Sequence, residues 1–321
     1  MSVLIFAELD NGSIKKSSLE AIFYGKELAA KLSTSAVALA IGASNESVLA
    51  IAGNFGASKV LHANDAQLEA QNPLAYASVL AAAAQQESAE VIVLAKSSLG
   101  DAVAARATGK LKAALVSNVT ELPDLTNGFT VKRSIYTGKA FANTNMNAAV
   151  KILAIKKNAV APIETSDLAT VSTFSPEIPP QDLAAKVIKT EKATGELSLT
   201  EADIVVSGGR GLKGPENWGV LIDLARALGA ATGCSKPVSD LDWRPHHEHI
   251  GQTGIKVSPN IYFACGISGA IQHLAGVNSS KIIVAINKDP EAPFFKAADY
   301  GIVGDVFDVL PRLTKAIEAG K

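Results

Sequence analysis

The stretch IVVSGGRG at residues 204–211 runs from a short apolar segment directly into a turn of small residues and one arginine. The same change recurs in YFACGISGA at residues 262–270 and in IIVAINKDP at residues 282–290. A short apolar run that ends in such a turn is typical of a strand buried in a parallel sheet. Turns of this kind gather at the carboxyl ends of the strands, where α/β proteins bind ligands. The pattern therefore predicts an α/β domain with a ligand site at this edge.

The composition of these turns favours a nucleotide as the ligand. Glycine lets the backbone approach a ligand closely, and the N–H groups that open a helix favour phosphate. One small turn alone would indicate little, because such turns occur in every α/β protein. Three in one domain, one with Arg210 and one before a helical segment at residues 271–274, favour a nucleotide. The usual NAD fingerprint and the P-loop are both absent from the sequence.

The flanking sequence extends this pattern in both directions. In the second half we predict a helix through Leu228 that Asn217 caps and Gly229 ends, and a closing helix at residues 309–318. In the first half strand-like and helix-like segments alternate, which is typical of βαβ units with helices over a parallel sheet. The predicted strands are residues 3–9, 36–41, 59–62 and 90–95, and the predicted helices are residues 17–32, 47–53 and 73–87.

Near residue 114 the pattern changes to four successive strands, at residues 114–121, 129–136, 139–145 and 149–155. We interpret them as hairpins added to the edge of the first domain, since Asn127-Gly128 and Thr137-Gly138 separate them. Residues 158–200 are irregular and proline-rich, with one predicted strand at residues 185–190 that returns to the first domain. The predicted fold is α/β with two domains. Residues 1–195 form a parallel-sheet domain with added hairpins, and residues 196–321 form a doubly wound domain.

The whole-chain composition excludes several classes of protein. A length of 321 residues suits two domains, and 48% apolar residues supply a sizeable core. The net charge of −1, without a block of five or more lysines or arginines, argues against nucleic-acid binding. The N-terminus lacks the basic region of a signal peptide, and no apolar run reaches the ~20 residues that span a bilayer. Because two cysteines cannot form a disulfide framework, we expect a soluble, cytoplasmic protein.

Four longer blocks in the second domain carry a family resemblance. They are SGGRGLK at residues 207–213, GQTG at 251–254, GISGAIQHLAG at 266–276 and VAINKDPEAPFFKAADYGIVGD at 284–305. Together they resemble the C-terminal domain of the electron-transfer flavoprotein alpha subunit. The first domain is similar to that family more loosely, in its order of strands and helices and its late hairpins. On these blocks the chain is identified as a member of the family.

The resemblance implies that FAD lies extended across the second domain. Arg210 matches the arginine of the family that binds FAD, and its guanidinium can donate two hydrogen bonds to the diphosphate or ribityl side. Residues 268–273 match the segment that cradles the pyrophosphate, and residues at later strand ends match positions for the adenosine half. Thr253 matches the residue near N5 of the flavin ring, and His273 the one near its pyrimidine oxygen. The implied FAD-binding residues are Arg210, Ser235, Lys236, Ile250, Gly251, Gln252, Thr253, Ser268, Gly269, Ala270, Ile271, Gln272, His273, Asn287, Asp305 and Val306.

One position departs from the family. The resemblance implies an anionic flavin semiquinone, which a cation or an N–H donor beside the pyrimidine side of the ring stabilises. After Ser235 the family usually carries an arginine, and this chain has Lys236. Lysine keeps the positive charge but loses the planar fork that can lie along the flavin. We therefore expect FAD binding to persist, with a weaker stabilisation of the semiquinone.

The implied function is electron transfer without catalysis. Family members pair with a smaller beta subunit, which the first domain is expected to contact. They accept electrons from acyl-CoA and related dehydrogenases and pass them to a membrane quinone oxidoreductase. A second reading is a subunit of an electron-bifurcating complex that oxidises NADH, and a third is an interaction subunit with a vestigial FAD site. The intact glycine-rich turns, Arg210 and Thr253 argue against the third reading.

The histidine cluster and the two cysteines of the second domain could suggest a metal site or a redox disulfide. His246, His247 and His249 lie beside Glu248, yet they follow a proline in an irregular loop without the i, i+4 spacing of a helical zinc pair, so we predict no metal site. Cys265 lies in an apolar strand and is expected to be a buried small side chain. Cys234 lies beside Ser235 without a partner cysteine close in sequence, so we predict no redox disulfide.

Overall fold

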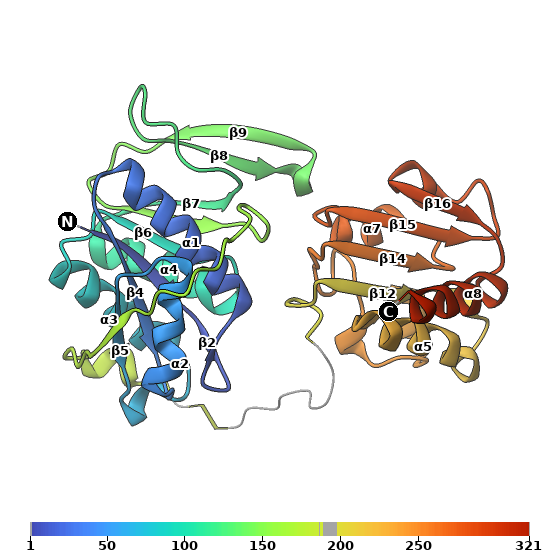
Figure 1. Ribbon diagram of the computed structural model, residues 1–321, viewed down its shortest axis with the longest axis horizontal. Helices are drawn as coiled ribbons and strands as arrows, with labels where there is room; N and C mark the ends of the chain where they lie inside the picture. The colour runs from blue at the N-terminus through green and yellow to red at the C-terminus, as the bar shows by residue number, and fades with distance from the viewer. Residues whose placement is uncertain (1, 186, 189–197, 321) are drawn as a thin grey trace. The chain divides into compact units, whose positions relative to one another are not determined.

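The computed structural model describes residues 2–185, 187–188 and 198–320 (Figure 1). The chain divides into two compact units, Met1–Glu191 and Lys192–Lys321. Each unit is a mixed α/β structure built on a parallel-rich sheet, as the alternation of segments in the sequence predicts. The boundary predicted at residues 195 and 196 falls outside the described residues.

The first unit is built on a nine-stranded sheet in the order β11-β5-β4-β1-β6-β10-β7-β8-β9. All neighbours from β11 to β7 are parallel, whereas β8 and β9 are antiparallel additions. The bounds are β1 (Ser2–Ala7), β4 (Ser35–Ile41), β5 (Lys59–Ala63), β6 (Val91–Ala95), β7 (Ala114–Val119), β8 (Thr130–Ile135), β9 (Ala140–Asn145), β10 (Lys151–Ile155) and β11 (Thr170–Thr173). The minor elements are β2 (Leu9–Asp10), β3 (Ser13–Ile14) and α2 (Glu46–Ala50).

Helices cover both faces of this sheet. The central strand β1 is buried along its whole length, and its side chains alternate between two cores. Val3 and Ile5 belong to the core under α1 (Lys16–Lys31). Leu4 and Phe6 belong to the core under α3 (Pro73–Gln86) and α4 (Ser98–Leu111). Burial on both faces explains why the strands appear in the sequence as continuous apolar runs.

The predicted set of edge hairpins is wrong in one respect. Only β8 and β9 form a hairpin, while β10 lies inside the sheet, parallel to both β6 and β7. The reason is burial, because Ile152, Leu153, Ala154 and Ile155 are all almost completely buried and suit a central strand. The sequence analysis also missed α4 and β11. The predicted strand at residues 185–190 lies partly outside the described residues, and its described residues form no strand.

The proline-rich segment that follows β10 packs on the first unit. Its strand β11 pairs in parallel with β5. Further on, the Asp182 carboxylate accepts hydrogen bonds from Ser78 Oγ at 2.6 Å and from Lys110 Nζ at 2.7 Å. Lys110 and then Ser78 hold the pKa of Asp182 below its ordinary value. The segment is therefore anchored to α3 and α4 as far as this aspartate.

The second unit has five parallel strands in the order β13-β12-β14-β15-β16. Their bounds are β12 (Ile204–Gly208), β13 (Ala231–Cys234), β14 (Ile261–Cys265), β15 (Ile282–Asn287) and β16 (Tyr300–Val303). Helices α5 (Gly219–Leu228) and α8 (Val306–Ala319) share one apolar core, which includes Val206 of β12. The opposite core contains Val205 and lies on the side of α7 (Ile271–Val277). This strand order is that of a doubly wound fold, as predicted.

Helix boundaries in the second unit differ slightly from the sequence prediction. Asn217 is not the cap of α5, since it lies in a preceding 3-10 turn, Pro215–Asn217, and its amide donates to Glu216. Gly229 does end α5, in the left-handed conformation with φ 63°. Helix α8 begins earlier than predicted because the Asp305 carboxylate caps it, accepting from Phe307 N at 3.0 Å. Strands β13 and β16 were not predicted.

Among the helices of the described residues, none combines the length and the apolarity that crossing a bilayer requires.

Candidate functional site

The order of strands in the second unit reverses at β12, which marks the carboxyl edge of its sheet as the expected position of a ligand crevice. From β12 the chain moves to one side to form β13, and it then crosses back to form β14 on the other side of β12. The turns that follow β12 and β14 therefore diverge. In doubly wound sheets, ligands bind where this divergence occurs, outside the carboxyl ends of the strands. The glycine-rich turns singled out in the sequence lie at this place.

The two turns touch each other through their backbones. Gly209 N donates to Cys265 O at 2.9 Å, and Gly211 N donates to Gly266 O at 3.1 Å. A Cβ on Gly209 would lie only 2.3 Å from Gly266 O, and one on Gly211 would lie 2.7 Å from Gly266 Cα. Gly266 itself has φ 65°, in the left-handed region. Glycine is thus required on both sides of the contact, because a side chain would push the two turns apart.

Two cations border the crevice. Arg210 opens the 3-10 turn Arg210–Leu212, and its side chain is exposed. Within the described part of the chain, the Arg210 guanidinium makes no hydrogen bond and no ion pair, so its donors are available to an anionic ligand. Lys213 follows, with Nζ 3.6 Å from an oxygen of Asp305 and 4.9 Å from the centre of the Phe307 ring. Positive charge therefore faces the place where phosphate is expected.

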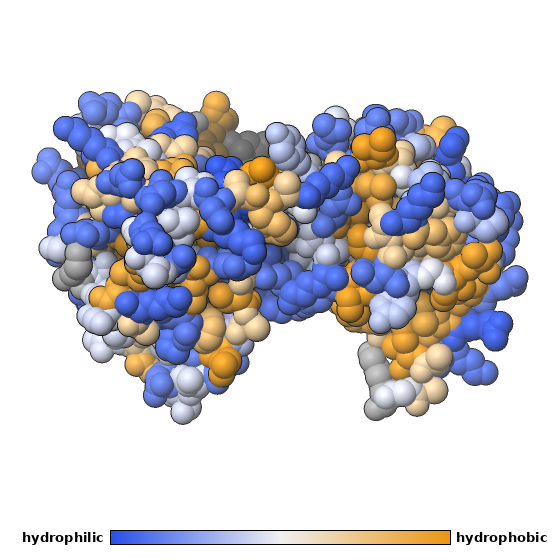
Figure 2. Space-filling model, turned by 90° about the horizontal axis from the view of Figure 1, so that it is seen from above, coloured by the Kyte–Doolittle hydropathy of each residue, from blue (hydrophilic) through white to orange (hydrophobic). Residues whose placement is uncertain are grey.

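The segment before α7 presents an open surface to solvent. Gly269, with φ 90°, lies so close to Phe294 that a Cβ would be 2.5 Å from Phe294 N. Ile271 begins the helix, and its large apolar side chain is 76% exposed. Figure 2 shows apolar side chains gathered on the visible face of this unit. The exposed residues at the start of α7 are Ser268, Ala270, Ile271 and Gln272.

A second turn, residues 251–254, is fastened to the same helix. Gln252 N donates to Gln272 O at 2.7 Å, and Gly251 N donates to Ile255 O at 3.2 Å. Gln252 and Thr253 are exposed at its tip, whereas Ile250 before it is completely buried. The turn is therefore held firmly while its outward residues stay open to a ligand.

The end of β13 adds the next part of the site. Ser235 is buried, and its N–H donates to Gly208 O at 3.0 Å, beside the end of β12. Lys236 begins the short helix α6 (Lys236–Asp240) and is exposed. Its ammonium pairs with Asp240 at 2.9 Å in an i, i+4 arrangement. Lys236 thus lies at the sheet edge with its charge partly balanced.

His273 lies beneath the surface of α7. Its side chain is only 5% exposed, and Nε2 lies 2.8 Å from the hydroxyl of Tyr262, which is fully buried. Its ring packs against Phe294 at a centroid distance of 5.8 Å. Burial lowers the pKa of His273 to about 4, with the charge of His249 as a smaller cause. His273 is therefore neutral at pH 7, and it can serve a ligand as an N–H donor but not as a cation.

One nitrogen of His273 is left with only a weak contact, since the Ile250 backbone raises the pKa of the ring slightly but forms no hydrogen bond of normal geometry with it. Nδ1 is buried and makes no hydrogen bond of normal geometry to the described residues. If the Tyr262 hydroxyl donates to Nε2, the ring proton resides on Nδ1. A buried N–H that lacks an acceptor is costly, by about 1–3 kcal/mol. An acceptor atom of a bound ligand would remove this cost.

The last three residues of the predicted set already have structural roles. The Asn287 amide donates to Ile267 O at 3.0 Å, and its oxygen accepts from Asp289 N at 3.0 Å. Asp305 caps α8, and the side chain of Val306 is 97% buried in the core shared with α5. These residues shape the rim of the crevice. Contact between them and the adenosine half stays a prediction.

The predicted residues come together because hydrogen bonds and an ion pair join the turns at this edge. Ser235 is linked to the end of β12, the β12 turn to the β14 turn, and that turn to Asn287. Sequence reasoning missed Tyr262 and the ion pair of Lys213 with Asp305 as parts of the site. A tyrosine in an otherwise apolar strand, YFAC, was the only sequence indication of a buried hydroxyl that needs a partner.

The side chains of the histidine-rich loop, residues 244–249, form a hydrogen bond and an ion pair within the protein. His246 Nδ1 lies 2.7 Å from Ser239 Oγ, and Arg244 forms a two-pronged pair with the buried carboxylate of Glu248. Over the part of the chain that the structure describes, no group of three His, Cys, Asp or Glu side chains could hold a metal ion. Cys234 and Cys265 are both free and completely buried, as expected for Cys265.

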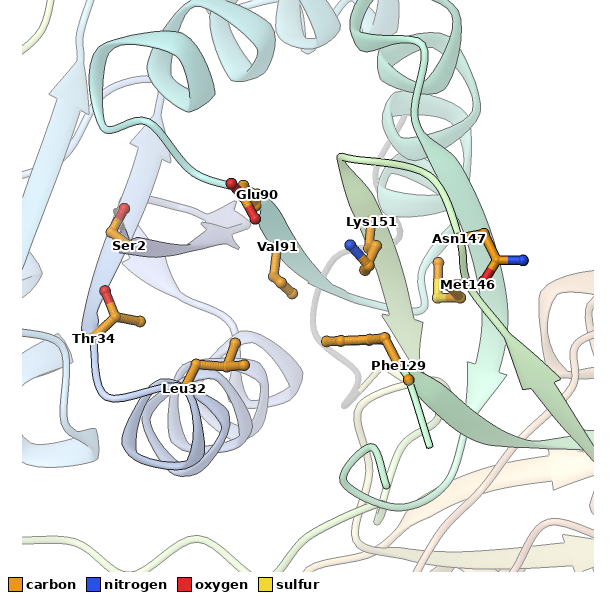
Figure 3. A pocket seen from close by; sticks show the side chains of 10 residues that line it. Ser2, Leu32, Thr34, Glu90, Val91, Phe129, Met146, Asn147 and Lys151 are labelled. Atoms are coloured by element: carbon orange, nitrogen blue, oxygen red, sulfur yellow. The ribbon is translucent and has the colours of Figure 1, made fainter. Parts of the chain in front are cut away.

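A separate cavity of about 370 Å³ lies in the first unit (Figure 3). Ser2, Val91 and Lys151 are the first residues of β1, β6 and β10, so the cavity lies at the amino ends of these strands. Ligands of parallel sheets bind at the opposite edge. This cavity is therefore not the counterpart of the crevice in the second unit.

The residues of the crevice fit a dinucleotide that carries a diphosphate and a flavin. Glycines at two touching turns let a ligand approach the backbone, and Arg210 offers an unused guanidinium to the diphosphate. His273 is neutral, and its Nδ1, which forms no hydrogen bond of normal geometry within the described residues, can donate to a ring oxygen. The exposed start of α7 and the tip of the 251–254 turn provide surface for a large planar group.

Comparison with known families and proteins agrees with this fit. Residues 3–179 match the electron transfer flavoprotein domain, and residues 198–278 match the electron transfer flavoprotein FAD-binding domain. Electron transfer flavoprotein subunit alpha of Bacillus subtilis is 36% identical over 314 residues, which covers 98% of this chain and 96% of the relative.

Two further relatives extend this result. The probable mitochondrial electron transfer flavoprotein subunit alpha of Caenorhabditis elegans is 37% identical, covering 98% of this chain and 93% of the relative. Protein FixB of Clostridium saccharobutylicum is 34% identical, covering 97% and 94%. The chain therefore belongs to the electron transfer flavoprotein alpha-subunit family, as an electron-transfer protein whose second unit is the FAD-binding domain.

Proposed function

We propose that this chain is the FAD-carrying subunit of a cytoplasmic heterodimer with a beta subunit. The heterodimer takes electrons from acyl-CoA and related dehydrogenases and passes them to a quinone oxidoreductase. The observation that carries this proposal is the contact of the two glycine turns at the carboxyl edge of the second sheet, with Arg210, which has no partner among the described residues, in the first of these turns. The first unit contacts the beta subunit.

Each part of the crevice has a task in holding the cofactor. Arg210 and the N–H groups of residues 268–273 bind the diphosphate, while Asn287, Asp305 and Val306 border the adenosine half. Ser235, Lys236 and residues 250–253 hold the flavin half, with Thr253 beside the N5 edge. Bound FAD supplies the redox centre, since it takes up and releases electrons singly.

The protein tunes that centre through the charges it places beside the ring. His273 is neutral above pH 5, because burial lowers its pKa to about 4, and its Nδ1–H donates to the pyrimidine oxygen. The positive charge at this edge is that of Lys236, weakened by its pair with Asp240. Such groups, fixed before the electron arrives, stabilise the negative charge that the ring gains.

Replacing Lys236 tests this electrostatic role. We expect Lys236→Ala to lower the first one-electron midpoint potential by about 20–40 mV, since an exposed charge contributes about 0.5–1 kcal/mol. Lys236→Arg should preserve or raise the potential, because arginine keeps the charge and adds a planar fork. Stepwise reduction of each variant with a reference dye measures the potential. If Lys236→Ala leaves it unchanged, Lys236 has no part in tuning the flavin.

Purification with the beta partner tests the proposed function as a whole. One FAD per heterodimer, reduced by an acyl-CoA dehydrogenase with its substrate and inert to NADH, is the expected result. A second flavin together with turnover of NADH would replace the proposal by the bifurcating complex. A colourless heterodimer that does not take up added FAD would leave an interaction subunit.

A further inference from the structure

The side chain of His249 lies against the backbone of the 251–254 turn. A Cβ on Gly254 would be 2.8 Å from its Nδ1, and a Cβ on Gly251 would be 3.3 Å from its Nε2. One imidazole ring therefore spans both ends of the turn, with one nitrogen toward each glycine. A larger residue at either glycine would displace the ring, so the turn and the ring are shaped to each other.

The backbone of His249 is fixed on both sides of this ring. Its carbonyl accepts from Ile255 N at 2.8 Å, which closes the turn, and its N–H donates to His246 O at 3.1 Å. The next residue, Ile250, donates to Cys234 O at 2.9 Å at the end of β13. The ring therefore lies against both ends of a turn whose exposed tip is Gln252 and Thr253.

The charged and titratable groups that face His249 come from four elements. Lys236 and Asp240 lie on α6, and His246 lies in the preceding 3-10 turn, His246–Glu248. His273 lies on α7 and is influenced by the charge of His249. Cys234 ends β13, where burial raises the pKa of its thiol to about 12 and keeps it neutral.

Burial lowers the pKa of His249, and the nearby charge of Lys236 lowers it further, while Asp240 acts in the opposite direction. The ring is therefore neutral at pH 7 and gains its proton below the ordinary histidine range. His273 stays neutral down to about its pKa of 4. Lowering the pH therefore adds a positive charge behind the turn at His249.

We infer that His249 is a positioning residue of the flavin-facing turn, and that its protonation makes the reduction of bound FAD depend on pH. The inference rests on the proposed function, because it takes the 251–254 turn to face the flavin ring. His249 touches the turn and not the ligand, so it acts through Thr253 and through its charge.

The direction of the effect follows from the sign of the charge. Below the pKa of His249 the imidazolium adds a second positive charge beside Lys236, and this favours an electron on the ring. Coupling between two equilibria is reciprocal, so reduction of the flavin must in turn raise the pKa of His249. As pH falls from 7.5 to 5, uptake of the first electron should therefore become more favourable than the flavin alone would produce.

The test compares the FAD-loaded heterodimer of the wild type with His249→Gln and with the matched control His246→Gln. The equilibrium constant for the first electron is measured from pH 5 to pH 8 at low ionic strength. From pH 7.5 to pH 5 this equilibrium constant should rise about two- to fivefold more in the wild type than in His249→Gln. A factor of this size is expected for the charge of a partly buried side chain. His246→Gln should keep the full size of the pH response, moved to slightly higher pH, because its imidazole does not touch the turn but its charge lowers the pKa of His249.

A second measurement does not depend on the variant being folded. In the wild type, NMR of 15N-labelled histidine should show His249 titrating at higher pH in the reduced than in the oxidised protein. An FAD-loaded protein in which this difference is missing, or in which His249→Gln keeps the full pH response, overturns the inference alone. A wild-type heterodimer that does not bind FAD overturns the proposed function as well.

Discussion

Replacing Gly209 by alanine should weaken FAD binding at least ~100-fold, because the new methyl group would push the two glycine turns apart. Its Cβ would lie 2.3 Å from Gly266 O and 2.8 Å from Gly266 C, which are backbone atoms that cannot swing aside. The backbone of Gly209 has φ −116°, which alanine adopts freely, so the effect is purely steric. We also expect a loss of about 1–3 kcal/mol in the free energy of unfolding. Titration of the FAD-free heterodimer with FAD, followed by flavin fluorescence, measures the affinity.

Gly219→Ala is the matched control for this substitution. Gly219 begins α5 in the same unit, and a Cβ there would meet no atom within 4 Å. The control should bind FAD as the wild type does, with stability unchanged or increased by less than about 1 kcal/mol. Wild-type FAD affinity in Gly209→Ala would show that the contact of the two turns does not form the binding site.

Arg210→Ala should raise the dissociation constant for FAD by about 10- to 100-fold, with the free energy of unfolding unchanged. Hydrogen bonds to charged groups contribute about 1.5–3 kcal/mol, and a guanidinium can make two of them to a diphosphate. Within the described residues Arg210 has no partner, so its removal breaks no contact of the folded protein. Arg210→Lys should have a dissociation constant for FAD between those of the wild type and Arg210→Ala, because lysine keeps the positive charge but loses the planar fork of the guanidinium.

Arg226→Ala controls for the loss of an arginine from the second unit. The Arg226 side chain is 75% exposed, and among the described residues its ion-pair partner is Asp223 of the same helix, at 3.1 Å. The Arg226→Ala variant should bind FAD with the affinity of the wild type when the two proteins are measured at the same salt concentration. Equal affinities for Arg210→Ala and Arg226→Ala would remove Arg210 from the diphosphate site.

The fold was predictable where the sequence pattern is local. The central strands β12, β14 and β15 are apolar runs followed by turn residues, and burial on both faces leaves them little other choice. Strand β16 was missed because all four of its residues are exposed at the edge of the sheet, so it lacks an apolar pattern. β10 was assigned to a hairpin because its place between β6 and β7 depends on pairing between distant segments.

The candidate site was predictable in its turns but not in its side-chain contacts. Glycine at residues 209, 211 and 266 marks a close backbone approach, and family blocks place the remaining residues in the same crevice. The burial of His273 under Tyr262 depends on how α7 packs over β14. Its neutral state follows from that packing, so no pattern in the sequence could indicate whether it acts as a cation or as a neutral donor.

Hydrogen–deuterium exchange of the heterodimer, with FAD bound and with FAD removed, tests most directly whether the crevice of the second unit holds the cofactor. FAD should slow exchange at residues 209–213, 251–254 and 266–273, because a bound ligand would restrain these turns and shield them from water. FAD should not change the exchange rate of the residues around the cavity of the first unit, including Phe129, Met146 and Lys151. Protection at that cavity, with none at the glycine turns, would contradict the account.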